Sequence, residues 1–346
     1  MGIAEQEYGD FSARLYGKAY NGRIPAVGHF ELTFKCPLEC MFCYCTVYTS
    51  PEHTRREVTT EQAVRILDQA ADAGCLWMTF SGGDPFIRPD FMQIYNHAIA
   101  RGLICTIFCS GLLATDEWIR HLQKNPPLKI ELPLYGITKA TYEATSGKKN
   151  TFERAVANIR KMIAAGLPIR IKSKIIDLNA HEVPALKHFV ETELGVDFNP
   201  SWDLYPRLDG SKDHLAHRLN PLEVRKLEAL NDGPMGCESS TANLVSDELN
   251  PKVFRCASGV NSFYVNPYGE LNFCTFVRQA SYDLKTGNIA HGVAQLYDHL
   301  LSMTYDDGTS CKSCAIQGSC GNCPGHAVLE TGSLTGKSQY LCDENH

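Results

Sequence analysis

Two patterns of apolar and polar residues, one typical of strands and one typical of helices, alternate along residues 28 to about 205. Short apolar runs typical of buried strands are followed by longer segments with apolar residues three and four positions apart, which is typical of helices packed on a sheet. The predicted strands are His29–Phe34, Leu76–Phe80, Leu103–Phe108, Leu128–Leu134, Ile169–Ile176 and Val196–Leu204. The predicted helices are Thr60–Ala73, Asp90–Ala100, Asp116–Gln123, Phe152–Ala165 and His181–Glu193.

Strands joined by short helical crossovers predict a parallel sheet with covered faces. The six predicted strands are fewer than the eight of a closed barrel, so the pattern favours a partial, open (β/α)6 barrel of the α/β class. In such folds active sites lie at the carboxyl ends of the strands. We therefore expect the functional residues there.

Near residue 233 the pattern changes, with a break at Asn231–Pro234. The remainder is rich in Gly, Asn, Ser and Cys, and only short strands are predicted, at Phe263–Val265 and Glu270–Phe273. With few large apolar residues, this part is expected to need metal for its stability. The predicted organisation is an N-terminal segment (1–27), the partial barrel (28–232) and a small Cys-rich α+β domain (233–346).

Charge and hydropathy exclude some classes of partner. The 33 basic and 39 acidic residues leave a net charge of −6, which argues against a nucleic-acid-binding surface. The chain contains no apolar run long enough to span a membrane and no secretory signal at its start. These features predict a soluble cytoplasmic protein.

The 15 cysteines are bunched along the chain. Cys36, Cys40 and Cys43 stand in a loop directly after the first predicted strand. Three thiolates this close can hold three irons of a 4Fe–4S cluster and leave the fourth iron open, as a catalytic metal site requires. The alternative is a structural zinc knuckle, which needs a fourth ligand. Cys45 is the nearest further thiol, and its spacing from Cys43 is poor for that role.

The Cys-x3-Cys-x2-Cys motif, followed by the aromatic Tyr44, resembles the signature of the radical S-adenosylmethionine superfamily. The resemblance covers residues 28 to about 205. It implies that S-adenosylmethionine binds the open iron through its amine and carboxylate. One electron from the cluster would then release a 5′-deoxyadenosyl radical. The resemblance assigns no catalytic side chain beyond the cysteines.

A second element follows the second predicted strand. Ser81, Gly82, Gly83 and Asp84, before Pro85, resemble the family's Gly-Gly-Glu-Pro stretch, which holds the amino group of S-adenosylmethionine. Asp84 stands where the family has Glu. The two glycines allow the backbone to approach a ligand closely. An ordinary strand-to-helix turn is the alternative.

Further cofactor-binding candidates rest on the same resemblance. Tyr44 corresponds to an aromatic near adenine, and Ser110 ends the third strand where the family contacts the ribose. Lys172 and Ser173 could reach the carboxylate or the ribose. For each of these residues a structural role is an equal alternative. The segment 134–147 resembles a stretch common in peptide-modifying members.

Eight cysteines follow the break, and the spacing of the last seven closely resembles the SPASM extension of radical S-adenosylmethionine enzymes, which implies two auxiliary 4Fe–4S clusters. By this resemblance the distal cluster is held by Cys311, Cys314, Cys320 and Cys342. The proximal cluster is held by Cys256, Cys274 and Cys323. Two zinc sites are the alternative, because spacing alone does not separate zinc from iron.

The proximal set is one ligand short. Either Cys237 completes it or one iron stays open to a substrate thiolate. The family's last pair is usually separated by three residues, whereas Cys320 and Cys323 are separated by two. Cys75, Cys105 and Cys109 lie in or beside strands and are predicted core residues.

The SPASM resemblance implies an enzyme that modifies a ribosomally made precursor peptide by crosslinking, excision, epimerisation or oxidation. Its partners would be that peptide, an external reductant such as flavodoxin or ferredoxin, and a separate peptide-recognition protein. Alternatives are a sulfatase-type protein maturase and a non-catalytic iron–sulfur carrier or zinc scaffold. His29, Glu31 and the segment Trp202–Arg207 are expected to face the barrel opening, where substrate should pass.

Overall fold

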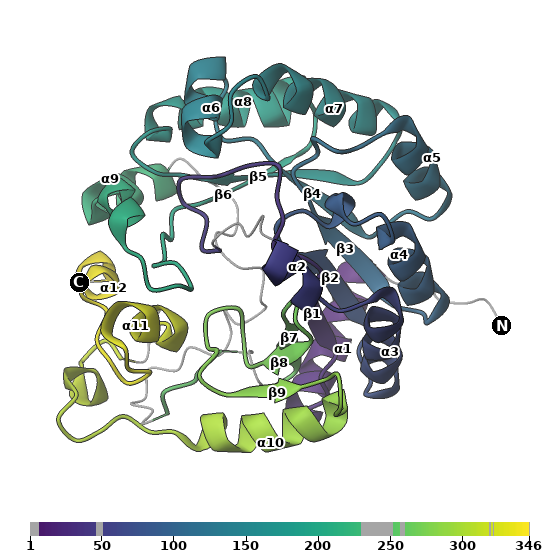
Figure 1. Ribbon diagram of the computed structural model, residues 1–346. Coiled ribbons are helices and arrows are strands. Elements are labelled where there is room, and N and C mark those ends of the chain that lie inside the picture. Colours follow the sequence, from purple (N-terminus) through teal and green to yellow (C-terminus); the bar gives the residue numbers. More distant parts are fainter. Residues whose placement is uncertain are drawn as a thin grey trace.

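The computed structural model describes residues 7–45, 51–229, 252–256, 260–317, 320 and 322–345. Its central feature is a curved sheet with the strand order β6-β5-β4-β3-β2-β1-β7-β8-β9. The first six strands are parallel neighbours, as an open (β/α)6 barrel requires, so the predicted α/β fold class is confirmed (Figure 1). They are β1 (Val27–Glu31), β2 (Trp77–Ser81), β3 (Ile104–Phe108), β4 (Lys129–Pro133), β5 (Ile169–Lys174) and β6 (Asp197–Ser201).

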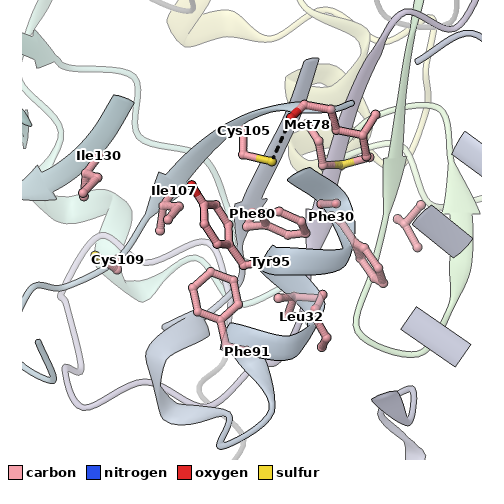
Figure 2. Close-up of a cluster of buried hydrophobic side chains, with 14 of the residues drawn as sticks. Phe30, Leu32, Met78, Phe80, Phe91, Tyr95, Cys105, Ile107, Cys109 and Ile130 are labelled. Carbon is pink, nitrogen blue, oxygen red and sulfur yellow. Dashed lines mark hydrogen bonds between the residues drawn. The ribbon is translucent and has the colours of Figure 1, made fainter. Parts of the chain in front are cut away.

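Helices cover the outer face of this sheet (Figure 1). They are α3 (Thr60–Asp72), α4 (Phe91–Ala100), α5 (Asp116–Lys124), α7 (Phe152–Ala164) and α8 (Val183–His188), which continues as a π-helical turn at Phe189–Glu193. Thr59 caps the N-terminus of α3, and its side chain accepts from the Gln62 amide in a capping box. Between helices and sheet, Phe30 and Phe80 pack with Phe91 in the core (Figure 2).

The opposite face of the sheet is polar. Successive side chains of a strand point to opposite faces, so residues that alternate with the buried apolar ones face the inside of the barrel. These include His29 and Glu31 of β1, Glu131 of β4, and Lys172 and Lys174 of β5. This inner face, called the chamber side of the sheet, therefore suits contact with a polar or charged ligand.

Several elements were not predicted. The segment before β1 forms α1 (Tyr8–Gly22), whose residues are mostly exposed. The others are α2 (Pro51–Arg56), α6 (Lys139–Ser146), α9 (Pro221–Glu228) and 3-10 turns at Pro85–Ile87, Ala180–Glu182, Asp213–His217 and Ser310–Ser313. α6 and α9 lie in the connections after β4 and β6. Of the described helices, none is long and apolar enough to cross a membrane.

The C-terminal part continues the same sheet. β7 (Ser262–Val265) pairs in parallel with β1, and β8 (Glu270–Asn272) and β9 (Ser281–Asp283) extend it antiparallel. Three helices follow, α10 (Ile289–Ser302), α11 (Pro324–Thr331) and α12 (Gln339–Asn345). α10 lies below β8 and β9, whereas α11 and α12 lie near α9 (Figure 1).

The C-terminal part contributes to the main apolar core, although its sequence contains few large apolar residues. Its expected need for metal stays a prediction. Phe263, Leu271, Phe273, Leu296 and Leu300 are buried and belong to the main hydrophobic cluster. They lie in or next to β7, β8 and α10, which are separate in the sequence and pack together in the fold. The predicted boundary at residue 233 lies outside the described residues and stays a prediction.

Candidate metal centres

The three cysteines of the first motif lie together in the loop that follows β1. Burial and the neighbouring thiolates of Cys43 and Cys36 raise the pKa of Cys40 well above the usual range of a thiol. A metal deprotonates the thiols that bind it, and a cationic iron–sulfur core relieves the repulsion between the resulting thiolates. The donor set therefore fits a cluster. Cys45 is buried and hydrogen-bonds Cys43, which lowers the pKa of Cys43.

The glycines of the second element hold this cysteine loop. Gly83 N donates to Thr33 O at 2.7 Å, and Asp84 N donates to Lys35 O at 2.8 Å. A Cβ at Gly82 would overlap the carbonyl oxygen of Thr33, and one at Gly83 would overlap that of Lys35. The sequence interpretation assigned the glycines to ligand approach. In the structure the missing side chains of the two glycines let their backbone lie directly against that of Thr33 and Lys35, which comes just before Cys36.

The segment 134–147 supports the other side of the cysteine loop. Glu39 N donates to Ser146 O and Met41 N donates to Thr145 O, each at 3.0 Å. Gly147 has φ +70°, and a Cβ there would overlap the carbonyl oxygen of Glu39. These contacts give the stretch a structural role. From the sequence it was identified only by its resemblance to peptide-modifying members of the family.

Asp84 and Ser110, two of the predicted cofactor-binding residues, bind each other. The fully buried carboxylate of Asp84 accepts hydrogen bonds from Phe86 N at 2.9 Å, from Ser110 N at 3.0 Å and from the Ser110 hydroxyl. Burial raises the pKa of Asp84. The pair joins the loops after β2 and β3, so both side chains position the backbone around the candidate site.

Tyr44 is anchored by a buried carboxylate. Its hydroxyl donates to Glu31 Oε1 at 2.5 Å. The other oxygen of Glu31 accepts from the Tyr264 hydroxyl of β7 and from Arg278 Nη2 at 3.4 Å. Sequence reasoning missed Tyr264 and Arg278, because only the pairing of β7 with β1 brings them to Glu31. This network ties the first cysteine loop to the C-terminal part.

Lys172 and Ser173 lie on opposite faces of β5. Lys172 Nζ forms an ion pair with Glu131 Oε2 at 2.7 Å and lies 4.3 Å from the centre of the Phe108 ring, on the chamber side. Ser173 is buried on the face that carries Ile171, which packs in the core. Adjacent residues of a strand cannot share a face. The structure therefore places Lys172 at the chamber and Ser173 away from it.

Four C-terminal cysteines line one pocket: Cys311, Cys314, Cys320 and Cys342. Burial, followed by the neighbouring Cys320, Cys314 and Cys342, raises the pKa of Cys311. This is the set that the SPASM resemblance assigned to the distal cluster. The Cys-rich C-terminal region fits a SPASM domain.

A second set gathers nearer the barrel. Burial and the neighbouring Cys323 and Cys256 raise the pKa of Cys274 to about 12. Burial and Cys256 raise the pKa of Cys323 to about 11. Cys237 lies outside the described residues, so its role as fourth ligand stays a prediction. Within the described residues, no three His, Cys, Asp or Glu side chains are arranged to hold a single metal ion.

The segment after β6 differs from its prediction. Trp202 was expected to face the opening, but it packs in a small separate core with Ile175 and Val224. Tyr205 stacks on Phe276 at 4.2 Å and lies 4.5 Å from the His326 ring, measured between centroids. Arg207 Nη2 donates to Met41 O at 3.2 Å. The segment thus connects the first cysteine loop with the region of Cys274 and Cys323.

Three further cysteines were predicted to be core residues. This prediction is confirmed, because Cys75, Cys105 and Cys109 are buried.

His29 is expected to make stability depend on pH. Burial, followed by the positive charges of Lys172 and Arg278, lowers its pKa from 6.5 to about 4. The unfolded chain therefore takes up this proton first as the pH falls below 6.5. When the pH falls from about 7.5 to about 5, this residue should therefore lower the free energy of unfolding by about 1–2 kcal/mol.

Anaerobic denaturant unfolding of the wild type and His29→Gln across this range measures the effect. The variant should lose less stability on acidification. Equal losses in the two proteins would contradict the assignment.

An open parallel barrel with three clustered cysteines at the carboxyl end of β1 is the arrangement of a radical S-adenosylmethionine enzyme. The chain belongs to the radical SAM superfamily, whose family model matches residues 30–185. The PqqA peptide cyclase of Gluconobacter oxydans is 31% identical over 255 residues, which cover 70% of this chain and 68% of that protein. The PqqA peptide cyclase of Granulibacter bethesdensis is 31% identical over 156 residues, 45% of this chain and 41% of that relative.

Solved structures share the fold along nearly the whole chain. Streptococcus suis SuiB bound to the precursor peptide SuiA has a TM-score of 0.73 at 16% identity, covering 99% of this chain and 82% of that one. Native anSMEcpe with bound AdoMet and Kp18Cys peptide has a TM-score of 0.67 at 14% identity, covering 92% and 95%. The similarity extends beyond the barrel into the C-terminal part.

Proposed function

We propose that this chain cleaves S-adenosylmethionine and uses the resulting radical to modify a ribosomally made precursor peptide. The observation that carries the proposal is the loop with Cys36, Cys40 and Cys43, fixed between two backbone supports at the carboxyl end of β1. When bound, a 4Fe–4S cluster on these cysteines supplies the electron that splits S-adenosylmethionine into methionine and a 5′-deoxyadenosyl radical.

The peptide substrate is supported by the relatives. Those that match in sequence are named PqqA peptide cyclases, and the SuiB and anSMEcpe structures hold a precursor peptide and a peptide respectively. In this chain the polar inner face of the barrel would receive the peptide. Lys172 and Glu131 offer one positive and one negative charge there, held together as an ion pair until a ligand competes for either.

The C-terminal cysteines would hold two auxiliary 4Fe–4S clusters. The distal cluster would be held by Cys311, Cys314, Cys320 and Cys342. The proximal one would be held by Cys256, Cys274 and Cys323, with Cys237 as fourth ligand or with an open iron. These groups suit the redox step that follows hydrogen abstraction, and an external flavodoxin or ferredoxin would supply the first electron. The two sets lie in different surroundings, one lining the pocket and one beside Tyr205 and His326.

The test is anaerobic reconstitution followed by iron and sulfide analysis and a dithionite-driven assay for 5′-deoxyadenosine. Three cubanes predict about 12 irons per chain. A candidate precursor peptide, to be sought among short reading frames beside the gene, should increase 5′-deoxyadenosine formation and change in mass. Modification of a sulfatase instead would favour the sulfatase-type maturase. Bound zinc without 5′-deoxyadenosine would contradict the proposal and favour the scaffold.

A further inference from the structure

The pocket of the four distal cysteines is lined by positive charges and hydrogen-bond donors. Besides the thiols, its wall consists of Arg255, Tyr305, Gln317, Asn322, Lys337 and Ser338. No Asp or Glu belongs to this described lining. Such a wall suits an anionic occupant. A 4Fe–4S core with four thiolates is anionic, since the ligands carry more negative charge than the core carries positive charge.

We propose that Arg255 sets the reduction potential of the cluster that this pocket holds. The inference rests on the proposed function for the presence of that cluster and goes beyond it by naming the residue that tunes it. Arg255 is a positioning residue in this role, because it would act on the redox group through its charge.

Arg255 is fixed at the pocket by the backbone. Its Nη1 donates to Gln317 O, and its Nη2 donates to Cys320 O at 3.1 Å. Its Nε is buried and has no hydrogen-bond partner among the described residues. A guanidinium is always charged, so the chain holds a permanent positive charge at the pocket wall, with a buried Nε–H that has no partner among the described residues.

The sign of the effect follows from charge. Reduction adds one electron to an already anionic cluster, and a nearby positive charge stabilises the reduced form more than the oxidised form. The potential is therefore raised. The interaction is stronger where water is partly excluded, as at the half-buried Arg255, than at the exposed Lys337. Removing either charge should lower the potential, with the larger change for Arg255.

A purely structural role must be separated from this electrostatic one, because Arg255 also holds the backbone carbonyls of Gln317 and Cys320. Arg255→Lys keeps the charge and loses the forked contacts. Arg255→Gln loses the charge. Lys337→Gln removes a charge without such a clamp. Arg101→Gln is the control, since Arg101 ends α4 and pairs there with Asp68 and Asp72.

The experiment is an anaerobic redox titration followed by electron paramagnetic resonance. The full-length chain would carry Cys36→Ala, Cys40→Ala and Cys43→Ala, so that only auxiliary clusters contribute. At the midpoint potential of this parent protein, Arg255→Gln should lower the ratio of reduced to oxidised distal cluster about tenfold, which is a shift of about 59 mV for one electron. Lys337→Gln should shift the same component less, and Arg255→Lys and Arg101→Gln should leave it near the parent value.

An unchanged potential in Arg255→Gln with full iron content would overturn the inference, as would equal shifts in Arg255→Lys and Arg255→Gln. If Arg255→Gln loses its iron, Lys337→Gln decides, and an unshifted potential there overturns the inference. Failure of the proposed function looks different. In that case Cys311→Ala and Cys342→Ala would remove no iron from the parent protein.

Discussion

Replacement of Cys40 by alanine is expected to abolish 5′-deoxyadenosine formation and to remove about four of about 12 irons per chain. Cys40 lies between Cys36 and Cys43 in the loop after β1, and its half-buried thiol has theirs as neighbours. Loss of residues that merely support a metal ligand costs about 10–100-fold, so loss of a ligand itself should exceed that. The auxiliary irons should remain, because their cysteines belong to other elements.

Cys45→Ala is the matched control for this prediction. Cys45 is also buried and hydrogen-bonds Cys43, but we do not assign it as a ligand. The variant should keep its iron and lose no more than about 10–100-fold in activity, as for an outer-shell partner. If Cys45→Ala lost the metal as completely as Cys40→Ala, a site with four thiolates would be favoured, and with it the zinc knuckle.

The second large effect is expected from Gly83→Ala. The added methyl group would overlap the carbonyl oxygen of Lys35, which is a backbone atom next to Cys36. Relief of this overlap requires movement of the cysteine loop, because neither backbone segment can rotate away as a side chain could. Overpacking typically costs about 1–3 kcal/mol, and a clash between two backbone segments should reach or exceed the upper end. We also expect loss of the first cluster, measured as a decrease from about 12 to about 8 irons.

Gly17→Ala provides the contrast, because nothing lies within 4 Å of a Cβ at Gly17 of α1. Gly-to-Ala exchange inside a helix should stabilise by about 0.5–1 kcal/mol. Denaturant unfolding and iron analysis of the two variants measure both effects. A Gly83→Ala protein with wild-type stability and full iron content would show that the contact between Gly83 and Lys35 does not hold the loop.

Much of the barrel could be predicted because its signals are local. A buried strand appears in the sequence as an apolar run, and a covering helix appears as apolar residues three to four positions apart. The predicted strand Ile169–Ile176 and the observed β5 accordingly differ only at the C-terminal end. The family resemblance of their spacing likewise indicated both C-terminal cysteine sets. Members of a set such as Cys311 and Cys342 are distant in the sequence, so only the family resemblance could group them.

The C-terminal core was missed for a physical reason. Its apolar residues, such as Phe273 and Leu300, are scattered among polar ones and look sparse along the chain. They become a core because β7 pairs with β1 and extends the barrel sheet. Long-range pairing leaves no periodic signal in either strand, and the same pairing carries Tyr264 to Glu31.

By itself, the sequence determined the class of this protein: an open parallel barrel, three cysteines after the first strand, and a cysteine-rich extension. Those features depend on residues that are neighbours in the chain. Only the tertiary structure decided that Gly82 and Gly83 make room for the cysteine loop, that Lys172 and not Ser173 faces the chamber, and that Arg255 reaches the distal pocket. Each of these depends on which backbone segments meet, and that is set by packing between residues far apart in the sequence.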